Sequence, residues 1–442
     1  MHILKGDVTL WSLEPQIAPF YSFMLADSAF RLPLLLNLGL NFHTLSVDGA
    51  SSLNKLLRYL AAATYLRRLT LLEPESTFES YPMLSRTVQG FTCLQSIQLI
   101  GAGEASINVL NNIQSSLVSV DIEYLLDQDE EWIGIPSLHQ SRSTLCDLTL
   151  KYGAVVGFDL VNKCVYSNGT QVALPDSSVR DVHEVIRAFP RLQRLEALGT
   201  GRCNTFDELR AFNQARQREL GSWSRLEEYC GPVCTLYELA IACPIASLHL
   251  TSDFGDNMMD PAMLMAVLSD AHPLKLSLQA HGYLCEQHPV FLSLFRQNSL
   301  RNLGTLVLEE WIATFEGGSE EVDWVKILDS LVDNIIAPLH FLEYFELYLC
   351  GDSSHWTGSI TAEAKRFLLS SLERQLAVWD AAAFVSRARA ANGNSALVLV
   401  IKYWDQAAKT TRIVDLSQRG ARADKREGPY HVTAPGAFRE AR

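Results

Sequence analysis

Apolar residues recur along this chain in the spacing apolar-x-x-apolar-x-apolar, and Leu66-x-x-Leu69-x-Leu71 is a clear copy. The first five copies start at residues 42, 66, 94, 117 and 145, so successive steps are 23 to 28 residues long. Leucine-rich repeats have periods of roughly 20–29 residues. Further copies start at residues 192, 226, 245, 273, 303 and 342, and those at 192 and 226 are the weakest. The spacing therefore predicts one structural repeat for each copy.

The second half of each copy alternates between apolar and polar residues, as expected for a β-strand with one buried face. One such strand and its crossover cannot bury their apolar face alone, so neighbouring repeats must stack. Parallel strands need a crossover connection, which helices supply. The prediction is an α/β fold, an irregular leucine-rich-repeat solenoid that is right-handed, with a parallel concave sheet and helices on the convex side.

Polar and aromatic residues occupy nearly all the outward positions of the predicted strands, and we expect them to form a contact surface for a partner. The candidate partner-binding residues on this concave face are Arg68, Thr70, Gln98, Asp121, Asp147, Lys151, His249, Lys275, Gln279, Glu309, Tyr344, Glu346 and Tyr348. Within this set Tyr344, Tyr348, Glu309, Lys275 and His249 are the preferred anchors, because aromatic and charged residues often dominate interfaces.

The regular repeats are expected to cover residues 42–358, with a cap, or the remnant of a truncated helical module, in residues 1–41. The first predicted strand is Phe42-x-x-Leu45-x-Val47, which would point Ser46 and its neighbours outward. An inserted hairpin is predicted near residues 155–174, because Asn168-Gly169 lies between alternating segments.

Residues 359–416 are predicted to form a C-terminal cap of helix and strands. The pattern indicates a long helix over residues 361–391, ended by Asn392-Gly393-Asn394, and then a strand pair. The strands are expected at residues 397–404 and 410–416. Residues 417–442 are rich in Arg, Ala and Gly and hold few apolar residues, so a disordered tail is expected there.

The formal net charge is −13 and the pI about 5.4, which argues against nucleic acid as a partner, since phosphate binding requires a basic face. Apolar runs stay well below the roughly 20 residues that span a bilayer, and the N-terminus does not resemble a secretory signal. The nine cysteines therefore read as reduced thiols. A cytoplasmic or nuclear location without membrane insertion is expected.

No motif in the sequence has the residues and spacing of a catalytic, cofactor or metal site, so neither an enzyme nor a bound cofactor or metal is predicted. Gly101-Ala102-Gly103-Glu104 has the context of an anion site between a strand and a helix, but it lacks the remaining glycine of a dinucleotide fingerprint, and a turn of the repeat explains it fully. Cys230, Cys234 and Cys243 do not have the spacing of a zinc site. Catalytic residues converge in space, so a hydrolase or transferase on an α/β frame stays an alternative.

The chain resembles the fungal F-box/leucine-rich-repeat proteins. The resemblance rests on the irregular Leu-x-x-Leu-x-Leu copies, together with residues 20–25 (Phe-Tyr-Ser-Phe-Met-Leu) and 31–35 (Arg-Leu-Pro-Leu-Leu). An F-box module itself is not evident, and residues 13–17 are only a faint echo of its start. The asparagine that usually follows the strand is absent in most copies, so the turns are expected to satisfy their backbone groups individually.

The resemblance implies that the repeats capture a protein target for a cullin–RING ubiquitin ligase. A Skp-type adaptor would then dock to an N-terminal F-box remnant. The alternative is a leucine-rich-repeat interaction scaffold with no role in ubiquitin ligation.

Overall fold

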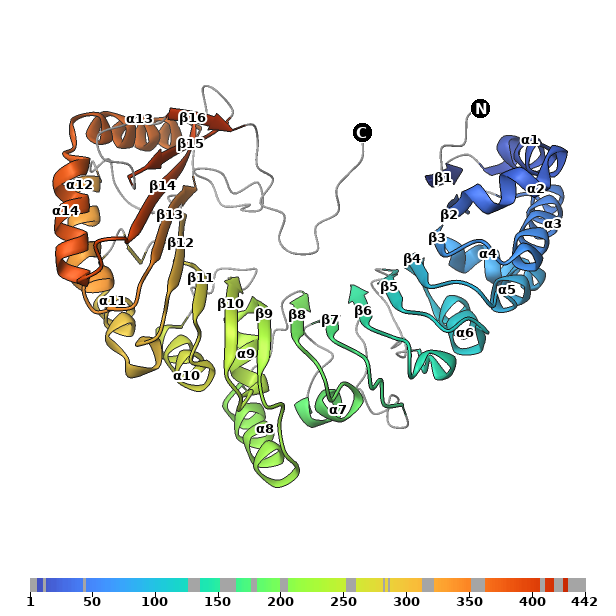
Figure 1. Cartoon of the computed structure of the whole chain (residues 1–442), viewed down its shortest axis with the longest axis horizontal. Helices are drawn as coiled ribbons and strands as arrows, with labels where there is room; N and C mark the ends of the chain where they lie inside the picture. The colour runs from blue at the N-terminus through green and yellow to red at the C-terminus, as the bar shows by residue number, and fades with distance from the viewer. Residues whose placement is uncertain are drawn as a thin grey trace. The chain divides into compact units, whose positions relative to one another are not determined.

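The computed structural model describes residues 6–10, 13–42, 45–125, 136–151, 164–175, 181–198, 206–251, 260–280, 283–284, 287–311, 322–350, 362–405, 410–416 and 424–427. The chain divides into two compact units, which are called the N-unit (Met1–Trp223) and the C-unit (Ser224–Arg442). Each unit is an α/β structure, with a parallel sheet and helices packed along one of its faces (Figure 1).

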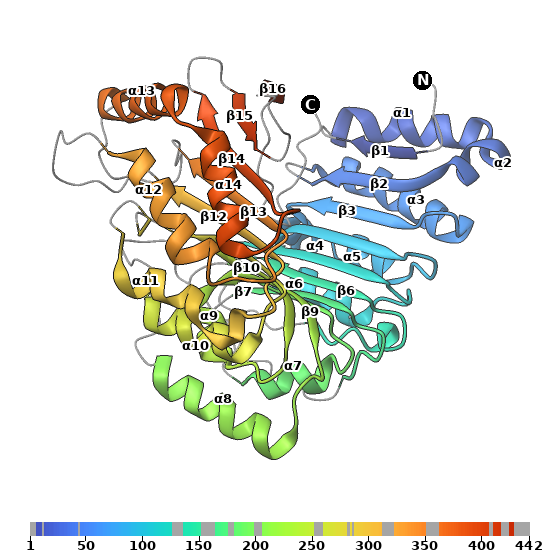
Figure 2. The same ribbon diagram turned by 60° about the vertical axis from the view of Figure 1, so that its left-hand side comes forward.

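The N-unit sheet runs in chain order, and each strand pairs in parallel with the next. Figure 2 shows β1, β2 and β3 side by side. The strands are β1 (Gly6–Leu10), β2 (Leu35–Asn41), β3 (Arg68–Leu72), β4 (Ser96–Ala102), β5 (Ser119–Tyr124), β6 (Asp147–Lys151), β7 (Gln171–Pro175) and β8 (Arg194–Leu198).

The apolar positions of the repeat are in register across the strands, as the spacing predicts. Leu69 pairs with Ile97, Ile97 with Val120 and Val120 with Leu148. All four side chains are at most 1% exposed, so they form one row of a continuous core between the sheet and the helices. The parallel α/β repeat is therefore confirmed.

Helices lie between most of the N-unit strands in the chain, and they pack along one face of the sheet (Figure 1). In α3, Ser46 caps the N-terminus by accepting a hydrogen bond from the Gly49 N–H at 3.1 Å. Leu53, Leu56, Leu57 and Leu60 of that helix are buried. The helices are α1 (Leu13–Ala26), α2 (Ser28–Arg31), α3 (Val47–Ala63), α4 (Pro74–Ser80), α5 (Pro82–Gln89), α6 (Glu104–Asn112), α7 (Val182–Ala188) and α8 (Phe206–Leu220), with 3-10 turns η1 (Leu32–Leu34) and η2 (His139–Ser141).

The predicted position of the first strand, which starts at Phe42, is wrong by seven residues. The strand is Leu35–Asn41, and its Leu38 and Leu40 pair with Leu69 and Leu71 of β3. Val47 instead begins α3, with Ser46 as the N-cap and Asp48 in the first turn. Leu35-x-x-Leu38-x-Leu40 fits the repeat as well as the later copy does, and the capping residues decide between the two.

The N-terminal segment predicted as a cap has the architecture of a further repeat. Strand β1 pairs in parallel with β2, and α1 forms the connection between them. Ile17, Phe20 and Met24 of α1 are at most 3% exposed, so this helix packs on the same core as its neighbours.

The inserted hairpin is replaced by a parallel strand over its described residues. A tight turn does occur at Asn168-Gly169, where the Gly169 N–H donates to the Tyr166 carbonyl at 3.0 Å. The chain that follows is β7, which pairs in parallel with β6 and with β8. Asn168-Gly169 therefore marks a turn, but the strand after it pairs with the strands of the two neighbouring repeats and not with the chain before the turn. Residues 155–163 of the predicted hairpin lie outside the described residues.

The C-unit repeats the same design. Strands β9 to β14 pair in parallel in chain order, and β15 and β16 continue the sheet as antiparallel strands. The strands are β9 (Leu226–Pro232), β10 (Ile245–Thr251), β11 (Lys275–Gln279), β12 (Thr305–Trp311), β13 (Tyr344–Cys350), β14 (Val398–Asp405), β15 (Thr410–Asp415) and β16 (Asp424–Glu427). The helical elements are α9 (Val233–Leu239), α10 (Pro261–Ala271), α11 (Pro289–Ser293), η5 (Leu294–Arg296), η6 (Asn298–Leu300), α12 (Trp324–Leu331), the π-helical turn η8 (Val332–Ile336), α13 (Ala362–Val378) and α14 (Ala381–Asn392).

The C-terminal cap of helix and strands agrees with the prediction in most respects. The predicted long helix is broken into α13 and α14, because Asp380 starts a new helix by capping the Ala383 N–H at 2.9 Å. Gly393, with a φ of 79°, ends α14. The antiparallel strand pair is confirmed.

The expectation of disorder over residues 417–442 is wrong for Asp424–Glu427, which form β16 on the edge of β15. An unpaired strand edge offers backbone donors and acceptors to any nearby segment, including a polar one. Among the described helices, none has the length and apolar character needed to cross a bilayer.

Candidate protein-binding faces of the sheets

The N-unit sheet has a second face, opposite the helices, whose side chains on β3 to β6 are called the N-face. Its described candidates are Arg68, Thr70, Gln98, Asp121, Asp147 and Lys151, all on strands as predicted. Strand pairing places Thr70 beside Gln98 and Gln98 beside Asp121. The spacing of the repeat therefore brings residues that are far apart in sequence into one row.

A chain of polar contacts runs along this row. The hydroxyl of Thr70 lies 3.4 Å from Gln98 Oε1, and Gln98 Nε2 donates to Asp121 Oδ2 at 3.0 Å. Lys151 Nζ then approaches both oxygens of the Asp121 carboxylate at 3.2 Å. The Asp121 and Lys151 side chains are 25% and 15% exposed, so the row is partly accessible to a partner.

Arg68 and Asp147 lie in a second row of the N-face. Arg68 pairs with Ser96, Ser96 with Ser119 and Ser119 with Asp147 along the strands. Burial raises the pKa of Asp147, and the positive charge of Arg194 opposes that rise. Arg68 is exposed, so the two ends of this row present opposite charges, although they are not in contact with each other.

The corresponding surface of the C-unit, on strands β9 to β14, is called the C-face. His249, Lys275, Gln279, Glu309, Tyr344, Glu346 and Tyr348 all lie on these strands, as predicted. Gln279 pairs with Glu309, and Glu309 pairs with Tyr348. Lys275 is exposed, while the other six are half-buried. The C-face thus combines two tyrosines with carboxylates.

The two carboxylates of this set have different environments. Glu346 accepts a hydrogen bond from the Tyr344 hydroxyl and pairs with Lys402 Nζ at 2.8 Å. Glu309 accepts one hydrogen bond, from Gln279 Nε2 at 3.3 Å. Burial raises the pKa of Glu309, the Gln279 hydrogen bond opposes the rise, and the charge of Glu346 adds to it. Lys402 escaped the sequence analysis, because its strand lies beyond the recognised repeats.

His249 lies at the other end of the C-face. Its Nε2 is 3.4 Å from a carboxylate oxygen of Glu228 and 3.2 Å from the Ser247 hydroxyl. Glu228 was not a candidate, since the copy of the repeat at Leu226 is weak. The pair can bind a partner's donor through Glu228 or a partner's acceptor through the imidazole.

The Gly101–Glu104 segment does bind an anion, and the anion belongs to the chain. The Glu75 carboxylate, from α4, accepts hydrogen bonds from the N–H groups of Gly103, Ala105 and Ser106 at 2.7, 2.6 and 3.0 Å. The Ser106 hydroxyl adds a fourth at 2.6 Å. These are the free donors at the N-terminus of α6, where the helix dipole also favours a negative charge.

Gly103 is required by this cap. A Cβ at this position would lie 2.5 Å from the Glu75 carboxyl carbon, so the carboxylate occupies the space that a side chain would need. The segment is therefore a turn between β4 and α6, as predicted, and the anion that it binds is the Glu75 carboxylate. No sequence pattern pointed to Glu75, which lies 28 residues before Gly103.

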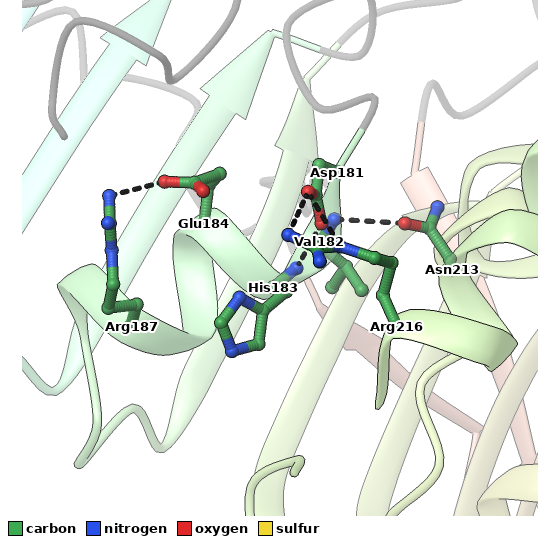
Figure 3. A network of polar contacts seen from close by, with 7 residues as sticks. All are labelled: Asp181, Val182, His183, Glu184, Arg187, Asn213 and Arg216. Carbon is green, nitrogen blue, oxygen red and sulfur yellow. Dashed lines mark hydrogen bonds and ion pairs between the residues drawn. The ribbon is translucent and has the colours of Figure 1, made fainter. Parts of the chain in front are cut away.

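A second network holds the N-terminus of α7, as Figure 3 shows. Asp181 accepts from the His183 N–H at 2.9 Å and from Nε and Nη2 of Arg216, both at 3.3 Å. Asn213, which is fully buried on α8, accepts from the Val182 N–H at 3.0 Å. This network binds α7 to α8, so its role is structural.

Among the described residues, no group of three or more His, Cys, Asp and Glu side chains could hold a metal ion. Cys230, Cys234 and Cys243 are buried, and burial raises the pKa of Cys243 to about 11. A thiol in that environment stays protonated at neutral pH and packs as a small apolar side chain.

The N-face and the C-face therefore each present hydrogen-bond donors and acceptors that are held in place by neighbouring side chains, and the C-face adds aromatic rings. No family model matches the chain, and no curated protein matches it.

Proposed function

We propose that this chain is a protein-binding repeat protein in which the N-face and the C-face are each a contact surface for a protein partner. The observation that carries the proposal is the row from Thr70 to Lys151, in which polar side chains on adjacent strands hold one another in place. Side chains that are already ordered lose little entropy when a partner binds, so more of the contact energy remains as affinity.

The C-face supports the same function with a different chemistry. Tyr344 and Tyr348 supply large, rigid side chains of the kind that dominate binding energies at interfaces. Glu309 and Lys275 lie on the neighbouring strands and can pair with polar groups of the partner. A protein surface offers both kinds of contact over an area as broad as several strands.

The test is site-specific photo-crosslinking in an extract of the source cells. A benzophenone amino acid is placed at Tyr348 on the C-face, or at Phe212 on α8 as a control that is 47% exposed. We expect a partner that crosslinks from Tyr348 and not from Phe212, and that is lost when Lys275→Glu is added. Equal crosslinking from both positions would contradict the proposal.

We further propose, on the family resemblance alone, that the bound partner is a substrate of an F-box-type ubiquitin ligase. The alternative is an interaction scaffold without a ligase. Ile17, within the faint echo of an F-box, is fully buried in the core, so adaptor docking is assigned to other residues. The free thiols of the described cysteines support the expected cytoplasmic or nuclear location.

A pull-down of the full chain, blotted for the Skp-type adaptor, separates these two roles. Retention of the adaptor at near-equal amounts with the crosslinked partner supports the ligase. Capture of the crosslinked partner without the adaptor supports the scaffold and removes the ligase from the proposal.

A further inference from the structure

A cysteine, a histidine and an arginine meet on the helix side of the N-unit, away from the N-face. Cys164 Sγ lies 3.4 Å from His139 Nδ1 and 3.4 Å from Arg142 Nη2. Arg142 Nη2 also lies 2.7 Å from His139 Nδ1. The histidine and arginine belong to the segment around η2, while Cys164 comes from the segment before β7. The three side chains come together only through the stacking of repeats.

The arginine fixes the protonation state of the histidine. A guanidinium is always protonated and can only donate, so His139 Nδ1 must accept and carries no proton. The Cys164 thiol lies 3.4 Å from the same Nδ1, and Arg142 Nη2 lies 3.4 Å from the sulfur, so the guanidinium can move its hydrogen bond to the sulfur as Nδ1 accepts the thiol proton. The imidazole is thus placed to take the thiol proton, as the base does in cysteine–histidine pairs. The Arg142 guanidinium would then face the thiolate that remains.

The thiol has a second acceptor nearby. Cys164 Sγ donates to the Ser137 carbonyl at 2.9 Å, and the Tyr166 hydroxyl approaches the same carbonyl at 3.2 Å. Burial raises the pKa of Tyr166, and Cys164 adds to that rise, so the phenol stays a neutral donor. The Tyr166 donor occupies part of the Ser137 carbonyl and so reduces its hold on the thiol proton.

We propose that Cys164, His139 and Arg142 form a reactive-thiol site that is oxidised by hydrogen peroxide. His139 Nδ1 takes the thiol proton, and the Cys164 thiolate attacks one oxygen of the peroxide. The S–O bond forms as the O–O bond breaks, and the leaving hydroxide takes the proton from His139. Sulfur is oxidised to a sulfenic acid, and the peroxide is reduced to water. Arg142 stabilises the negative charge on the sulfur and on the leaving oxygen.

Two features favour this oxidant over other reagents. The Cys164 residue is only 4% exposed, so a small molecule reaches the sulfur more easily than a bulky electrophile. The guanidinium beside the sulfur and the imidazole repels a metal cation and leaves only two neutral ligand atoms for one. A small oxidant that gains from a nearby positive charge meets both conditions.

The experiment treats the purified full chain with hydrogen peroxide and traps sulfenic acid with dimedone, followed by peptide mass spectrometry. Cys93 is the internal control, because it is more exposed than Cys164. Its thiol donates to the Leu66 carbonyl at 3.3 Å, and Arg67 lies beside it. Exposure alone would therefore make Cys93 the faster of the two. We expect Cys164 to be labelled faster by about tenfold or more.

Two variants test whether His139 and Arg142 cause the faster labelling of Cys164. His139→Ala and Arg142→Met should each lower the labelling of Cys164 toward that of Cys93, with no change at Cys93. Both residues are exposed, so little loss of stability is expected. Arg86→Met, at an exposed position on α5, is the matched control. In denaturant, where the geometry is lost, the two cysteines should be labelled at equal rates.

Three results would overturn the proposal. These are labelling of Cys164 no faster than Cys93 in the folded chain, a rate unchanged by His139→Ala, or a rate difference that persists in denaturant.

Discussion

The two sides of the N-unit sheet use the same kinds of polar residue for opposite purposes. On the helix side, the Glu75 carboxylate is almost fully buried and accepts four hydrogen bonds at the start of α6. On the N-face, the Asp121 carboxylate is 25% exposed and shares its oxygens between Gln98 and Lys151. The Glu75 carboxylate replaces the water that would otherwise accept these hydrogen bonds, whereas the Asp121 carboxylate stays partly in contact with water.

Stability and partner binding therefore depend on opposite sides of the sheet. A buried carboxylate that satisfies backbone donors is costly to remove, because the donors remain buried without a partner. An exposed ion pair is worth little, since water and salt take over its role. The helix side should therefore determine stability, and the N-face should be free to change with the partner.

Replacing Glu75 should have the largest effect. Glu75→Ala leaves three N–H groups and one hydroxyl of α6 without their acceptor, so we expect a loss of about 3 kcal/mol or more. Hydrogen exchange of the α6 amides, measured by mass spectrometry, should accelerate together with a lower unfolding midpoint. Glu79→Ala, an exposed change on the same helix α4, is the control and should change neither. Slow exchange of α6 in Glu75→Ala would show that the cap is dispensable.

Asn213→Ala should have the next largest effect. It removes the buried acceptor of the Val182 N–H, and we expect a loss of about 2 kcal/mol. The loss should appear as faster amide exchange in α7, while α6 is unaffected, because each network serves its own helix. Arg218→Ala, at an exposed position on α8, provides the comparison. If both helices lose protection to the same extent, the two caps are not independent.

The two caps also mark what sequence could and could not predict. The repeat spacing predicted the position of most strands correctly, because the buried leucines of neighbouring strands must be in register to form one continuous core. The pattern also gave α6 the context of an anion site. It could not name Glu75 as the anion, since the contact depends on how α4 packs against α6. The same limit hid Asn213 and the cluster at Cys164.

The polar faces were predictable in part. Alternation along each strand identified Thr70, Gln98 and Asp121 as neighbours on one face, and they are in contact there. It could not identify Lys402 or Glu228 as partners of Glu346 and His249, because their strands carry weak or unrecognised copies. The first strand failed for a related reason. Two copies of the pattern lie seven residues apart, and the Ser46 cap favours the earlier one.

Asp121→Ala tests the other side of the comparison. We expect a loss of stability below about 1 kcal/mol, since the lost contacts are partly exposed. Binding at the N-face should nevertheless weaken, because the contacts of Asp121 with Gln98 and Lys151 are lost. The measurement pairs an unfolding curve with crosslinking from a benzophenone amino acid at Arg68, an exposed position of the N-face, in the same variant. A stability loss as large as that of Asn213→Ala would remove the distinction between the two sides.

Glu309→Gln should have the smallest effect on stability, below about 1 kcal/mol, and a characteristic pH dependence. Burial and the charge of Glu346 raise the pKa of Glu309 in the folded chain. Between the ordinary pKa of a glutamate and this raised value, the folded state binds more protons than the unfolded state. Stability therefore falls as pH rises through that window, because the folded chain must ionise a half-buried carboxyl.

Glutamine keeps the shape of the side chain and cannot ionise, so Glu309→Gln should remove this pH dependence. At neutral pH the variant should be as stable as the parent chain or slightly more stable, whereas Glu75→Ala is destabilised at the same pH. Unfolding midpoints measured across the acid range for the parent and for Glu309→Gln decide the point. Parallel curves would mean that Glu309 ionises equally in both states. The Glu309 carboxylate would then present its charge to a partner at no cost to the fold.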